Sequence, residues 1–184
     1  MPRPGAPGRG RLSYGGALAL ALFRRHAALP ATLTLASAYA GWAGSLPAEV
    51  TAQRLRRAMG LADLPPAEFV GTLLPTMFSE ATPPESVDAF GASMLGFHPV
   101  GFRAMARASA ENLRDALPDV TVPTLLVYGD QDVRPLSVAE VLHRSIPGST
   151  LAVLPDAGHV CNLEASEAFN QTVRSFLDNQ PRER

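Results

Sequence analysis

Hydrophobic residues along this chain alternate between two patterns, which predict strands separated by helices. Short, nearly continuous apolar runs at residues 32–36, 124–128 and 150–154 are typical of strands that are buried on both faces of a sheet. Apolar residues spaced three and four apart predict flanking helices at 15–26, 135–146 and 164–177. A strand–helix alternation of this kind predicts an α/β fold with a parallel sheet.

The middle of the chain has a different pattern, in which helices are interrupted by prolines. Helices are expected at 49–59, 66–74, 84–95 and 99–117. Three of these four segments begin with proline, which is favoured in the first turn of a helix. We therefore expect residues 45–117 to be helical and to separate two parts of the α/β pattern.

The N-terminal residues have two readings. Residues 1–11, MPRPGAPGRGR, have no apolar periodicity and predict a disordered tail. The apolar run at 17–23 follows several arginines, as it would in a secretory signal, but it is only seven residues long. A membrane-spanning helix needs roughly 20 apolar residues. We therefore expect a soluble, cytoplasmic protein.

The amino-acid composition limits the kinds of partner that we expect this chain to bind. Apolar residues make up 46% of the chain and charged residues 18%, as in ordinary globular proteins. All 16 basic residues are arginines, and the formal net charge is -1. A nearly neutral chain has no electrostatic reason to bind nucleic acid or anionic membranes. The single cysteine, Cys161, excludes an internal disulfide and a cysteine-rich zinc site, and we interpret it as a small buried thiol.

At three places in the chain, polar residues stand where catalytic residues gather in α/β proteins, at the carboxyl ends of strands. Asp130 and Asp132 follow the 124–128 strand, and His159 follows the 150–154 strand. Ser13 stands just before the first predicted helix, where a preceding strand would end. The chain order Ser, Asp, His is the order found in hydrolases that carry the nucleophile on a sharp strand-to-helix turn.

Three segments resemble the α/β-hydrolase superfamily of small esterases, lactonases and non-haem peroxidases. They are LSYGGALALALFRRH, PTLLVYGDQDVRP and LPDAGHVCNLEASEAFNQTVRSFL. The resemblance implies that Ser13 is the nucleophile, His159 the base and Asp132 the acid of a triad that hydrolyses an ester, lactone or related acyl substrate. It also implies that the backbone N–H of Tyr14 stabilises the oxyanion, and that no cofactor takes part.

The same resemblance divides the chain into parts. Residues 12–44 and 118–184 correspond to the α/β core, and residues 45–117 correspond to the variable helical lid of the family. The family has about five strands before the nucleophile, whereas only eleven residues precede Leu12. We therefore expect the N-terminal half of the fold to be lacking. Such a chain would expose a sheet edge and tend to associate.

Each candidate residue has an alternative role. Ser13 could cap the helix through its hydroxyl, and Asp132 could stabilise a turn. Asp130 competes for the acid position, although the family spacing Gly-x-x-Asp favours Asp132. His159 alone could be a satisfied loop histidine. No His-x-x-x-His pair or cysteine cluster is present, so we expect no metal site.

One departure from the family pattern affects function. Two residues before Ser13, where the family has glycine, this chain has Arg11. The alternative to a hydrolase is therefore an inactive α/β-hydrolase remnant that serves as a binding or interaction module.

Overall fold

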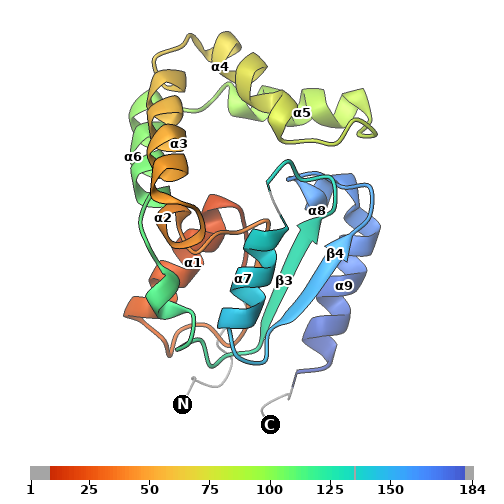
Figure 1. The fold of residues 1–184 in the computed structure, drawn as a ribbon. Coiled ribbons are helices and arrows are strands. Elements are labelled where there is room, and N and C mark those ends of the chain that lie inside the picture. The colour runs from red at the N-terminus through yellow and green to blue at the C-terminus, as the bar shows by residue number, and fades with distance from the viewer. Residues whose placement is uncertain (1–8, 135, 181–184) are drawn as a thin grey trace.

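The computed structural model describes residues 9–134 and 136–180, and it contains a four-stranded sheet that is wholly parallel. Figure 1 shows two of its strands, β3 and β4, side by side. The strands β1 to β4 lie side by side in chain order. Their bounds are Arg9–Leu12, Leu33–Ala36, Thr124–Gly129 and Thr150–Leu154. The predicted α/β class and parallel sheet are confirmed.

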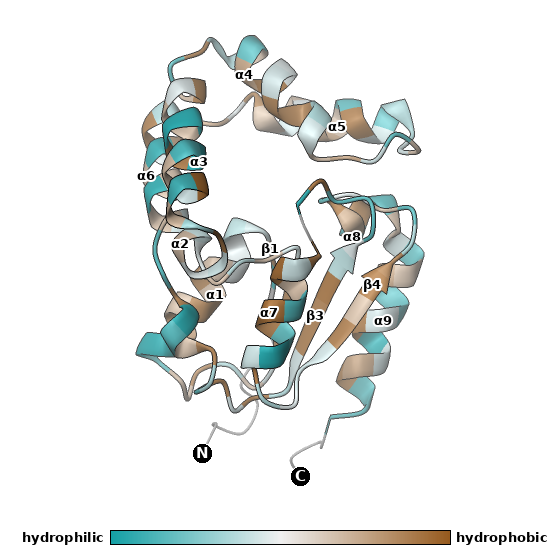
Figure 2. Ribbon diagram, in the orientation of Figure 1, coloured by the Kyte–Doolittle hydropathy of each residue, from teal (hydrophilic) through white to brown (hydrophobic). Residues whose placement is uncertain are grey.

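Helices cover both faces of this sheet. Helices α1 (Tyr14–Arg25) and α7 (Ser137–Ser145) pack on one face, where Leu35 and Leu126 are fully buried. Helices α8 (Cys161–Glu164) and α9 (Ser166–Asp178) lie on the other face, which Leu125 and Val127 share. Successive residues of β3 thus enter opposite cores, which explains why this strand is apolar at almost every position (Figure 2).

Strand β1 corrects the prediction of a disordered tail over residues 1–11. Residues 9–12 pair with β2, and Arg11 stands opposite Leu35. The pairing uses backbone groups, so a segment without apolar periodicity can still join the sheet through its ladder of hydrogen bonds. Residues 1–8 of the predicted tail lie outside the described residues.

The middle segment is helical, as the proline-punctuated pattern predicts, and it has an apolar core of its own that includes Phe69, Met94 and Phe102. In Figure 1, α4 and α5 lie above the carboxyl ends of β3 and β4. The elements in chain order are α2 (Trp42–Ser45), α3 (Ala48–Leu61), α4 (Pro66–Leu73), the 3₁₀ turn η1 (Leu74–Thr76), α5 (Pro84–Met94), α6 (Pro99–Ser109) and the 3₁₀ turn η2 (Arg114–Ala116).

Two helix boundaries differ from the predictions. The helix expected over 99–117 ends at Ser109. Beyond it, the backbone N–H of Leu113 donates to the carbonyl oxygen of Ala40 at 2.8 Å, which ties the chain to the loop after β2. The helix expected over 164–177 is divided at Ala165, because that residue has φ -119° and ψ 50°, outside the helical region.

Gly129, at the end of β3, has no room for a side chain. A Cβ atom there would lie 2.0 Å from the carbonyl oxygen of Ala157. We expect Gly129→Ala to destabilise the fold by about 2 kcal/mol or more, because the backbone of the loop after β4 must move. Gly60→Ala is the matched control, since nothing lies within 4 Å of that position in α3, and it should stabilise by about 0.5–1 kcal/mol. Urea denaturation measures both, and equal effects would contradict the predicted contact.

Candidate active site

Ser13 occupies a sharp turn between β1 and α1. Its φ is 52° and its ψ is -117°, a backbone conformation that non-glycine residues rarely adopt. The backbone N–H of Ser13 donates to the carbonyl oxygen of Ala36 at 2.8 Å, so β2 helps to hold the turn. Ser13 precedes α1 but makes no side-chain capping hydrogen bond, which removes the helix-cap alternative in this structure. Strain of this kind concentrates at functional sites.

Arg11 is accommodated because the residues after the turn are small. A Cβ atom on Gly15 would lie 3.3 Å from the Cβ of Arg11. A Cβ atom on Gly16 would lie 2.4 Å from the Cβ of Ala38. The absent side chain of Gly15 therefore leaves room beside Arg11, and the absent side chain of Gly16 leaves room for Ala38.

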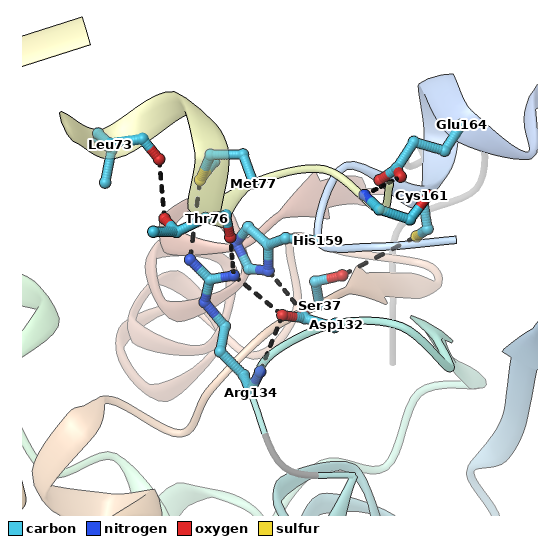
Figure 3. Close-up of polar contacts among 10 residues, drawn as sticks. Ser37, Leu73, Thr76, Met77, Asp132, Arg134, His159, Cys161 and Glu164 are labelled. Carbon is cyan, nitrogen blue, oxygen red and sulfur yellow. Dashed lines mark hydrogen bonds and ion pairs between the residues drawn. The ribbon is translucent and has the colours of Figure 1, made fainter. Parts of the chain in front are cut away.

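Asp132 and His159 form a buried pair (Figure 3). The Nδ1 of His159 lies 2.7 Å from Oδ2 of Asp132, and the two side chains are 1% and 3% exposed. When Nδ1 donates to this carboxylate, Nε2 of the neutral ring keeps a lone pair that can accept a proton. Asp130 is exposed, and the structure does not bring it to His159.

Arg134 holds the other oxygen of the same carboxylate. Its backbone N–H and its Nη1 donate to Oδ1 of Asp132 at 3.1 Å and 2.9 Å. The Nη1 group also donates to the carbonyl oxygen of Thr76 at 3.2 Å. Both carboxylate oxygens therefore have partners, which fixes the plane of Asp132 and links it to the helical segment.

The loop that carries His159 is anchored to that segment as well. The backbone N–H groups of His159 and Val160 donate to the carbonyl oxygen of Met77 at 3.0 Å and 3.2 Å. Oε2 of Glu164 accepts from the backbone N–H of Ser79 and from Oγ1 of Thr82, both at 2.7 Å. These contacts could not be predicted from the sequence, because every residue has a carbonyl oxygen. The side chains of Arg134 and Glu164, which lie within the family-like segments, were the only sequence features that pointed to them.

Burial and neighbouring charge determine the ionisation of the pair. Burial acts to raise the pKa of Asp132, but the hydrogen bond and charge of His159, together with Arg134, hold it below its ordinary value. Burial lowers the pKa of His159 below its ordinary value, and the cation of Arg134 adds to this, although the hydrogen bond to Asp132 opposes it. The imidazole is thus kept neutral, the form that a general base requires.

These shifts predict the acid limb of a pH profile. We expect kcat/KM to stay high as the pH falls below 6.5, the ordinary pKa of histidine, and to decline only at lower pH. Arg134→Met should move this limb towards higher pH, because the lost cation no longer disfavours the imidazolium. Initial rates across pH 4 to 9, about the range in which histidine and its neighbours titrate, measure both effects. An unchanged limb in Arg134→Met would contradict the assignment.

A cavity of about 300 Å³ joins the candidate residues. Ser13, Tyr14 and His159 all line it. Tyr14 is the first residue of α1, so its backbone N–H belongs to the helix turn whose donors lack intrahelical partners. Apolar side chains from the helical segment and from α1 cover most of the remaining wall, including Ala17, Ala58, Leu61, Leu73, Met77, Phe102, Met105 and Ala106.

Cys161 lies apart from this cavity. Its thiol is buried, as the sequence indicated, and its Sγ lies 3.9 Å from Oγ of Ser37. Burial raises the pKa of the thiol to about 11, so the nucleophilic thiolate is scarce at neutral pH.

Comparison with known proteins settles the family. Residues 12–172 match the alpha/beta hydrolase family. This chain belongs to that family. The match includes the turn of Ser13, the loop of Asp132 and the loop of His159.

Individual relatives of this α/β hydrolase are esterases. A pimeloyl-[acyl-carrier protein] methyl ester esterase of Neisseria meningitidis is 29% identical, over 90% of this chain and 67% of the relative. A thermophilic esterase of Thermogutta terrifontis is 31% identical with a TM-score of 0.80, and the match covers 92% of this chain and 63% of that one. An esterase of Exiguobacterium antarcticum is 26% identical with a TM-score of 0.83, over 94% and 66% of the two chains.

This α/β hydrolase spans less than two thirds of the length of those solved esterases. Its fold is therefore a partial α/β-hydrolase fold, as the sequence predicted. Within residues 9–134 and 136–180, no helix is long and apolar enough to cross a membrane. The same residues contain no group of three His, Cys, Asp or Glu side chains placed to hold a metal ion.

Proposed function

We propose that this protein hydrolyses an ester, lactone or related acyl substrate through a triad of Ser13, His159 and Asp132. The observation that carries the proposal is the meeting of two features at one cavity. Ser13 is held in a strained turn with φ 52°, and His159 is bound to Asp132 at 2.7 Å. A nucleophile on a turn and a base oriented by a carboxylate are the two parts that acyl transfer needs.

The proposed reaction begins with attack on the substrate carbonyl carbon. The Oγ of Ser13 forms the new bond while Nε2 of His159 takes its proton. Asp132 stabilises the imidazolium and keeps Nδ1 as the donor. The negative charge that develops on the carbonyl oxygen is stabilised by the backbone N–H of Tyr14, at the positive end of α1.

The tetrahedral intermediate then collapses to an acyl-enzyme. The carbon–oxygen bond to the alcohol breaks, and His159 returns its proton to the leaving alkoxide. Water attacks the acyl-enzyme with His159 again as base, which releases the carboxylic acid and restores Ser13. No redox step and no co-reactant other than water is required.

We assign the helices of residues 45–117 the role of a lid over a core formed by residues 12–44 and 118–184. The contacts of Thr76 and Met77 with Arg134, His159 and Val160 support this assignment. A lid tied to the base in this way would exclude bulk water from the acyl-enzyme and shape the acyl pocket.

Trapping of the acyl-enzyme tests the proposal. The chain is mixed with an aryl butyrate ester, quenched in acid within one turnover, and examined by intact-mass spectrometry. We expect release of the aryl alcohol together with a protein species heavier by one butyryl group. A folded chain that gives neither would contradict hydrolase function and favour a binding module.

A further inference from the structure

The described side chains that line the cavity carry charge of one sign only, apart from histidine. Among the described residues that line it are three arginines, Arg54, Arg57 and Arg134, and no aspartate or glutamate. Arg134 is neutralised, because its guanidinium lies 2.9 Å from Asp132. Arg54 and Arg57, one turn apart on α3, leave a net positive charge facing the same space as Ser13 and His159.

Arg54 is held in a defined position by two aromatic rings. Its guanidinium carbon lies 5.1 Å from the ring centre of Tyr39 and 5.5 Å from that of Trp42. A guanidinium over aromatic rings is held by cation–π attraction, which leaves it N–H groups that can donate to a ligand. In the described part of the chain, no carboxylate lies within ion-pair distance of Arg54.

Tyr39 supplies a second observation at the same place. Its side chain lines the cavity and the residue is only 6% exposed. Its hydroxyl oxygen is buried and makes no hydrogen bond of normal geometry with the described residues. Burial raises the pKa of Tyr39, and the Arg54 guanidinium lies close enough to oppose that rise. A buried hydroxyl without a partner is costly, so an unpaired one beside an unneutralised cation indicates a place for a ligand oxygen.

We propose that the substrate is an ester that bears a carboxylate, and that Arg54, supported by Tyr39, binds this carboxylate. Arg57, which is exposed at the rim, attracts the anion to the cavity. The apolar side chains of the same cavity accommodate the hydrocarbon part of the substrate and strengthen the ion pair by excluding water. This inference rests on the proposed hydrolase function and names its substrate class.

The test uses matched esters that differ only in charge. Monomethyl glutarate is compared with methyl valerate, in which a methyl group replaces the carboxylate of the acyl part. For a carboxylate on the alcohol part, γ-acetoxybutyrate is compared with butyl acetate. We expect kcat/KM of the wild-type chain to be at least about tenfold higher for the charged member of one pair, as a charge-assisted hydrogen bond would give.

Substitution of Arg54 then assigns the preference. Arg54→Met keeps the apolar stem and should bring the ratio of kcat/KM for the charged ester to kcat/KM for its neutral match close to one. Arg56→Met, an exposed position on the same helix outside the cavity wall, is the control and should retain the preference. Equal losses with charged and neutral esters would show that Arg54 only supports the fold, and would overturn the proposal.

Binding to Ser13→Ala separates this inference from the proposed function. Calorimetry with that variant measures monomethyl glutarate and γ-acetoxybutyrate without any requirement for turnover. We expect Ser13→Ala to bind one of these esters, and we expect the added Arg54→Met substitution to weaken that binding by about tenfold. This result supports the carboxylate site even if no ester is hydrolysed. If Ser13→Ala binds neither ester while the wild-type chain hydrolyses methyl valerate or butyl acetate, the carboxylate site is overturned and the hydrolase function is retained.

Discussion

Ser13→Ala should lower kcat for ester hydrolysis by about 10⁶-fold, the loss seen when the nucleophile of a serine triad is removed. The Oγ of Ser13 is the only protein atom in the proposed scheme that bonds to the acyl carbon, so no neighbouring side chain replaces it. Steady-state kinetics with an aryl butyrate measure the effect. The melting temperature should not fall, because alanine removes only a hydroxyl that makes no capping hydrogen bond.

Ser109→Ala provides the matched control for that substitution. Ser109 also lines the cavity and is 4% exposed, but it lies on α6 and has no proposed role. Its loss should leave kcat close to the wild-type value. If the two alanine variants lost activity equally, the activity would depend on the cavity in general, and the assignment of Ser13 as the nucleophile would be wrong.

Asp132→Asn should lower kcat by about 10⁴-fold with little change in KM. An amide at this position can present an N–H to Nδ1 of His159, which favours the ring tautomer whose Nε2 carries the proton. That tautomer cannot accept the proton of Ser13. The geometry should otherwise survive, because the amide oxygen can still accept from the backbone N–H and the guanidinium of Arg134.

Asp130→Asn distinguishes the two carboxylates that the sequence offered. Asp130 is exposed, and its backbone N–H, not its side chain, contacts β4 through Leu154 at 3.0 Å. We expect kcat of Asp130→Asn to stay close to the wild-type value. A larger loss in Asp130→Asn than in Asp132→Asn would mean that the family spacing selected the wrong residue.

The sheet could be predicted where its strands are short apolar runs. β2, β3 and β4 are such runs, and each appeared in the sequence at nearly its final bounds. β2 and β3 are buried along their whole length, as expected, whereas β4 lies at the sheet edge and only its last residue, Leu154, is buried. β1 could not be found in this way. Its sequence is Arg-Gly-Arg-Leu, and its pairing with β2 depends on backbone groups that every such segment possesses.

The residues of the candidate site could be predicted from the sequence only where a polar side chain directly follows a predicted strand. Asp132 and His159 each follow a predicted strand, and neighbouring parallel strands bring their carboxyl ends together. The supports of the pair were inaccessible, because the carbonyl oxygens of Thr76 and Met77 come from a segment more than fifty residues away in the chain. The contact of Arg54 with the rings of Tyr39 and Trp42 likewise depends on how α3 packs against the loop after β2 and the start of α2.

Arg11 shows how a local rule can be met by other means. The sequence pattern requires a small residue two positions before the nucleophile, because the turn brings that residue against the start of the helix. Here the close neighbour of Arg11 is Gly15, whose missing side chain leaves the space. The rule therefore concerns the pair of positions on either side of the turn, and a sequence test applied to one of them alone is too strict.

The identity of the nucleophile is the central claim, and covalent labelling tests it most directly. The chain is treated with a fluorophosphonate probe, digested, and the modified residue is located by tandem mass spectrometry. We predict a single adduct on Ser13, absent in Ser13→Ala and greatly slowed in Asp132→Asn. Labelling of another serine, or undiminished labelling in Ser13→Ala, would contradict the account.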